Sequence, residues 1–144
     1  MKTINWKLVL KLSMFGLVMA ISTVFWISSN TEPILWFLIF PLSAYMISKY
    51  ADSKYFLHGF LLGLANCVWI TAAHIVFINQ YLANHQQEAQ LMLNSSLSPA
   101  LMMLMTGPVI GIVSGVVFGL FAIVLNKVLK KAELTKKRRE NNYQ

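Results

Sequence analysis

Polar side chains suited to chemistry are scarce in the apolar parts of this 144-residue sequence, and two of them share one segment. Asn66 and His74 lie about two helical turns apart. An intramembrane amide or imidazole is either a polar contact between packed helices or part of a substrate path. A histidine can also titrate near neutral pH. Asn66 and His74 are therefore a candidate polar site, with both interpretations open.

A second polar pair, His85 and Glu88, has the i, i+3 spacing that lets an imidazole and a carboxylate share a metal ion. Two ligands are too few, and a third would have to come from Asn84, His74 or another subunit. The single cysteine, Cys67, cannot form a disulfide within the chain. No nucleophile–histidine–acid arrangement or carboxylate pair can be assembled from the few charged residues. We expect no enzyme activity, metal or cofactor.

Composition places the elements that carry these residues in a membrane. Hydrophobic residues make up 57% of the chain and charged residues 12%, which is too apolar for an ordinary soluble domain. Four apolar segments, approximately 8–28, 33–48, 56–78 and 100–125, are separated by polar connectors. They predict a single all-α domain of four transmembrane helices, followed by a basic tail over residues 130–144.

The second apolar segment is the shortest. At 1.5 Å per residue it covers about 24 Å, less than the roughly 30 Å of bilayer hydrocarbon. Pro41 lies near its middle and removes a backbone hydrogen bond. A kinked span is expected, and a re-entrant hairpin is the alternative.

Basic residues set the expected orientation. All 12 Lys and Arg residues fall on one side of the four-span arrangement, and the connectors 28–32 and 79–99 contain none. The positive-inside rule then places both termini in the cytoplasm. The net charge of +7 is explained by this topology, so no nucleic-acid partner is expected. The short loops favour a bacterial cytoplasmic membrane.

Small residues repeat every four positions in the last two apolar segments. Such stripes let two helix backbones approach closely in lipid. They predict a tight antiparallel pairing of the third and fourth spans, while the alternative is that one stripe faces a second copy of the chain. The two stripes are Gly59, Gly63, Cys67 and Thr71, and Gly107, Gly111, Gly115 and Gly119.

Clustered basic residues follow the fourth span. A cluster of Lys and Arg just beyond a cytoplasmic helix end is attracted to anionic lipid headgroups, and a simple stop-transfer anchor is the alternative. The cluster comprises Lys130, Lys131, Lys136, Lys137, Arg138 and Arg139.

The connector 79–99 is rich in Gln, Asn and Met, and we expect the third helix to continue through it to about Leu93 before a turn and a restart after Pro99. In layout, the half from Gly59 to Lys131 resembles a bacterial family of four-helix membrane proteins of unknown function. The shared features are a glycine-bearing third span, a Gln-, Glu-, Met- and Leu-rich connector, a proline before a glycine-repeated fourth span, and a basic tail. The resemblance implies the four-span topology and no catalytic residues.

From these features we expect a non-enzymatic membrane protein that acts through helix packing, as a homo-oligomer or as a subunit or accessory of a larger membrane complex. The alternative is a channel or carrier for ions or small solutes, with a polar path near Asn66, Thr71 and His74. Such a path would require a cavity beside these residues.

Overall fold

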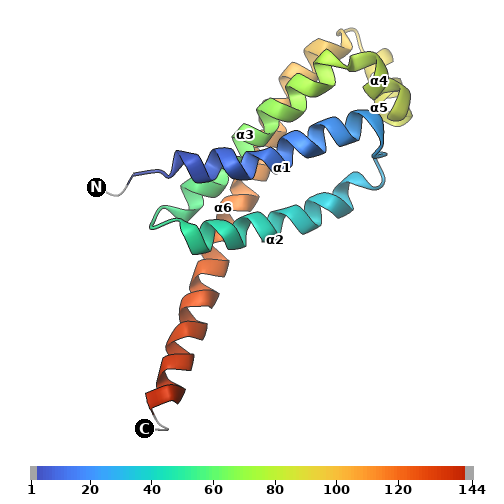
Figure 1. Ribbon diagram of the computed structural model, residues 1–144. Coiled ribbons are helices and arrows are strands. Elements are labelled where there is room, and N and C mark those ends of the chain that lie inside the picture. Colours follow the sequence, from blue (N-terminus) through green and yellow to red (C-terminus); the bar gives the residue numbers. More distant parts are fainter. Residues whose placement is uncertain (1–2, 142–144) are drawn as a thin grey trace.

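The computed structural model describes residues 3–141, all of whose regular elements are helices (Figure 1). Four of these helices are long and apolar enough to cross a membrane, which confirms the expected all-α fold with four candidate spans. Two short helices lie between the third and fourth candidates. The helices are α1 (Trp6–Phe25), α2 (Glu32–Tyr50), α3 (Tyr55–Val76), α4 (Ile78–Asn84), α5 (Gln86–Leu93) and α6 (Pro99–Asn141).

Glycines bring α3 and α6 into backbone contact. A Cβ added at Gly63 would collide with the backbone of Gly115, and one added at Gly59 would lie 2.5 Å from the backbone nitrogen of Gly119. Further along the helices, Gly111 lies against the side chain of Cys67, and Gly107 similarly faces Thr71. The two stripes of small residues therefore face each other across a single antiparallel interface within one chain.

Helix α1 packs against α3 on another face. The Asn66 side chain fits against Gly16 of α1, where a Cβ would collide with the amide. Nearby, the Trp69 indole Nε1 donates a hydrogen bond to Ser13 Oγ at 3.2 Å. Trp69, which lies near the middle of its apolar segment, thus fills the space between two helices and has a partner for its polar atom.

The helices of the bundle meet connectors at two ends (Figure 1). The end with the α2–α3 connector carries Lys residues, and we call it the basic end. The end with the α1–α2 connector, α4 and α5 carries Glu32 and Glu88 and no Lys or Arg, and we call it the acidic end. An apolar cluster at the basic end includes Leu12, Ile47 and Phe118. A smaller one at the acidic end joins Val24, Tyr81 and Met103.

A buried histidine fixes the start of α1 at the basic end. The His58 side chain is only 1% exposed, and its Nε2 accepts a hydrogen bond from the backbone N–H of Asn5 at 2.9 Å. Nδ1 lies 3.0 Å from the Lys54 carbonyl oxygen. Since one ring nitrogen accepts and the other must donate, His58 is the neutral tautomer protonated at Nδ1.

The structure bears on three of the sequence-based expectations. Helix α2 runs through Pro41 as one helix, so the re-entrant alternative for this segment is wrong. The connector is helical but is interrupted at Phe77 and at His85, so it does not simply extend α3. The α6 helix continues well past residue 125, leaving the bundle as a single helix (Figure 1); the last tail residues, 142–144, lie outside the described part.

Candidate functional site

A cavity of about 770 Å³ lies between α2, α3 and α6 and extends to α4 and α5 at the acidic end. Small-molecule sites in proteins enclose about 300–1,000 Å³, so the space is large enough for a ligand. It contacts both residues of the candidate polar site, Asn66 and His74, as well as Thr71. The polar residues singled out from the sequence therefore border one space.

The cavity exists because α2 packs tightly over only half of its length. Its buried residues, Ser43, Ala44 and Ile47, all lie after Pro41. In this half the Ser48 hydroxyl donates to the Ala122 carbonyl oxygen of α6 at 3.0 Å. The half before Pro41 has no buried residue. It stands away from α3 and α6 and forms one wall of the cavity.

Apolar side chains form most of the lining. The wall contributed by α2 is aromatic, and the facing wall of α6 is mainly aliphatic. Phe40 closes the cavity toward the basic end by stacking on Phe118, with ring centroids 4.0 Å apart. These walls favour an apolar part of a ligand. They comprise Trp36, Phe37 and Phe40 from α2, and Met103, Ile110 and Phe118 from α6.

Asn66 is a buried polar residue of this lining. It is 3% exposed, and neither the oxygen nor the nitrogen of its amide has a hydrogen-bond partner among residues 3–141. A buried amide without partners costs free energy that packing alone does not return. Because the amide lies against Gly16 of α1, this unsatisfied group belongs to the α1–α3 contact beside the cavity.

Carboxylates stand at the acidic end of the cavity. Glu32 accepts a hydrogen bond from the Trp36 indole Nε1 at 3.1 Å, and Glu88 accepts one from Ser29 Oγ at 2.9 Å. Both donors are neutral. Among the described residues that line the cavity, none is Lys or Arg. The cavity mouth thus combines two acidic groups without a basic group beside them.

Stacked rings connect the cavity to α4. The rings of His74 and Tyr81 are 4.0 Å apart, and those of Tyr81 and His85 are 4.2 Å apart. His74 Nε2 also lies 3.0 Å from Thr23 Oγ1 of α1. Burial raises the pKa of the Tyr81 phenol well above its usual range, and the charges of Glu88 and Glu32 raise it further. Tyr81 is therefore neutral at physiological pH.

His85 and Glu88, the pair considered as metal ligands, have separate hydrogen-bond partners. His85 Nδ1 is 3.2 Å from the Tyr81 carbonyl oxygen, and its buried Nε2 has no hydrogen-bond partner among the described residues. Glu88 bonds to Ser29 instead. Within residues 3–141, no three His, Cys, Asp or Glu side chains are grouped so that they could hold a metal ion.

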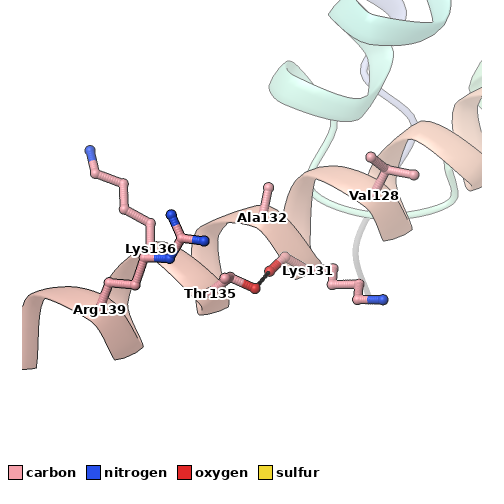
Figure 2. A pocket seen from close by; sticks show the side chains of 6 residues that line it. All are labelled: Val128, Lys131, Ala132, Thr135, Lys136 and Arg139. Carbon is pink, nitrogen blue, oxygen red and sulfur yellow. Dashed lines mark hydrogen bonds between the residues drawn. The ribbon is translucent and has the colours of Figure 1, made fainter. Parts of the chain in front are cut away.

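The basic tail of α6 carries a second, open hollow of about 600 Å³ (Figure 2). All of its lining residues, including Lys131, Lys136 and Arg139, belong to this single helix. The figure shows only the Thr135 hydroxyl bonded to the Lys131 carbonyl oxygen within the helix. The hollow is therefore a helix surface, and the tail offers charge rather than a binding cavity. The basic residues predicted to meet lipid headgroups are all exposed: Lys130, Lys131, Lys136, Lys137, Arg138 and Arg139.

Comparison of the chain with known protein families, with characterised proteins and with solved structures finds no match. The fold defines a class: an all-helical protein with four helices long and apolar enough to cross a membrane and a cavity between α2, α3 and α6. What the cavity does must be inferred from its residues.

Sequence reasoning identified Asn66 and His74 but missed the residues that face them from α2. Neither Trp36 nor Glu32 was among the candidate site residues. Their approach to α3 depends on the path of α2. The sequence nevertheless contained a sign of an acidic site. Glu32 and Glu88 are the only acidic residues that lie in connectors without a Lys or Arg.

Proposed function

We propose that this chain is a non-enzymatic membrane protein that binds a small amphipathic molecule in the cavity between α2, α3 and α6. The observation that carries the proposal is the cavity of about 770 Å³ itself, whose walls are largely apolar and whose acidic end carries Glu32 and Glu88. Pockets with mainly apolar walls and a few polar groups are typical small-molecule sites. A ligand with a polar group and an apolar body would fit this lining.

The glycine stripes argue against the role in assembly that was expected from sequence. Gly63 and Gly115 contact each other within one chain, as do the other paired positions of the two stripes. These small residues are therefore occupied by the α3–α6 interface. They give a second copy of the chain or a larger complex no close-packing surface.

A continuous ion channel is also disfavoured. Between the cavity and the basic end lies the apolar cluster that contains Leu12, Ile47 and Phe118, each 0–1% exposed. An ion path requires polar groups or water across the whole membrane. The geometry instead supports a binding protein or carrier that is open toward one side.

The charge distribution supports an orientation for this site. With both termini in the cytoplasm of a bacterial cell, the basic end lies at the inner surface and the cavity opens in the outer half of the membrane. The α6 helix is 43 residues long, about 64 Å at 1.5 Å per residue. Its basic part would project from the inner surface beside anionic headgroups.

Photolabelling tests whether the cavity admits a ligand. The probe is a neutral long-chain alcohol with a diazirine in its alkyl chain, added to the full chain in nanodiscs and mapped by peptide mass spectrometry. We expect labelling at the buried Met103 and at Thr71 to exceed that at the lipid-facing Val109 and Val113 severalfold, because the cavity holds the probe longer than the bilayer does.

Two matched variants locate the labelling. Ser114 lines the cavity, so Ser114→Phe fills part of it and should remove most of the label from Met103. Ile112 is 50% exposed and does not line the cavity, so Ile112→Phe should leave the labelling unchanged. Equal labelling around the whole circumference of α6 would show that the probe meets only bulk lipid and would overturn the proposal.

A further inference from the structure

We infer that the ligand of this cavity carries a positively charged ammonium group, held at the acidic end between Glu32 and Glu88, with an apolar chain that extends toward Phe118. This inference rests on the function proposed above and specifies the class of ligand.

The charges at the cavity mouth support a cation. Glu32 and Glu88 line the cavity, and each accepts a hydrogen bond from a neutral donor. Within residues 3–141, neither is paired with a basic side chain. Carboxylates beside a low-dielectric space attract a counter-charge strongly, because little water screens them. The bundle itself does not supply that charge, so a ligand would.

An aromatic ring at the same end suits an ammonium group. Trp36 lines the cavity, and its indole is fixed by a hydrogen bond to Glu32. Ammonium and quaternary ammonium groups bind the face of tryptophan. A carboxylate and an aromatic face together select a cation over a neutral polar head.

The deeper lining suits an apolar chain. From Glu32 to Phe40, α2 rises about 12 Å at 1.5 Å per residue. Along this path the walls are aromatic and aliphatic until Phe40 and Phe118 meet. A head group at the mouth and a chain of this length together describe a cationic amphiphile.

Competition against the photoreactive alcohol tests the inference. Decyltrimethylammonium, decanol and decanoate share one chain length and differ in head charge. In nanodiscs of phosphatidylglycerol, we expect decyltrimethylammonium to displace the label from Met103 at a concentration at least tenfold below that of decanol, with decanoate weakest. In the double variant Glu32→Gln, Glu88→Gln, the tenfold preference should fall to the level set by surface attraction to the anionic lipid alone.

The control variant Glu133→Gln, Glu140→Gln removes two carboxylates from the exposed tail of α6 and should retain the full preference. Labelling of the cavity variant by the neutral alcohol shows that it remains folded. A second arm adds phosphatidylethanolamine to the nanodisc. If this lipid competes with the label, a lipid amine is the source of the ammonium group. If the lipid does not compete, the source is a soluble amphipathic amine.

The outcomes separate the two proposals. If the alcohol labels the cavity but the three competitors act equally, or if the preference survives in the Glu32→Gln, Glu88→Gln variant, the cation inference is overturned and the binding function stands. If the alcohol never labels the cavity of the native chain, the binding function itself fails.

Discussion

Replacing Gly63 with alanine is expected to separate α3 from α6 and to leave little folded protein in a mild detergent. The added Cβ would meet the backbone of Gly115 and, at 3.1 Å, the carbonyl oxygen of Gly111. Backbone atoms cannot rotate away as a side chain can, so the helices must move apart. Overpacking typically costs about 1–3 kcal/mol and occasionally more. The measurement is the free energy of unfolding from titration with a denaturing detergent.

Gly107→Ala is the matched control for this prediction. Here the added Cβ would meet only the side chain of Thr71, chiefly its hydroxyl, which can adopt another rotamer. The same substitution in the same stripe should therefore be tolerated with a small loss of stability. Equal effects at Gly63 and Gly107 would contradict the backbone contact between α3 and α6.

Asn66→Leu is expected to stabilise the protein, the opposite of the effect expected for Gly63→Ala. Leucine has a similar branched shape, so it should fit against Gly16 without a cavity or a clash. It removes an amide whose two polar atoms have no hydrogen-bond partner in the described part of the chain. Removing an unsatisfied buried group should return about 1–3 kcal/mol. Thermal unfolding in nanodiscs measures the gain.

Asn84→Leu provides the comparison at a satisfied amide. The Asn84 Nδ2 donates to the Val24 carbonyl oxygen at 2.6 Å and holds α4 against α1. This variant should lose about 1 kcal/mol of stability. If Asn66→Leu also destabilised the protein, the Asn66 amide would have a structural partner within the fold.

Periodicity and hydropathy predicted the framework well. The four long apolar helices follow from hydrophobic runs that only a bilayer can accommodate. Their ends were less predictable. Helix α6 continues to Asn141 because Lys, Arg, Glu and Leu are strong helix formers even outside the membrane. The break at Phe77 depends on packing instead, since α4 turns to place Tyr81 and His85 in one ring stack.

The cavity could be predicted only in part. Asn66 and His74 were recognisable because polar residues inside apolar segments are rare. The facing wall was not, because it depends on α2 packing closely only after Pro41. No local sequence pattern predicts which half of a helix lies apart from the neighbouring helices. Glu32 and Trp36 belong to the site through this tertiary arrangement, which the sequence alone did not indicate.

The most direct measurement is a crystal structure of the full chain with a decyl ammonium compound that carries bromine at the end of its alkyl chain. Anomalous scattering locates the bromine independently of the protein density. We expect a single bromine peak inside the cavity near Phe40 and Ile110, with the ammonium group between Glu32 and Glu88. A bromine peak only on the lipid-facing surface of α6, with the cavity filled by rearranged side chains, would show that the cavity does not bind the cation.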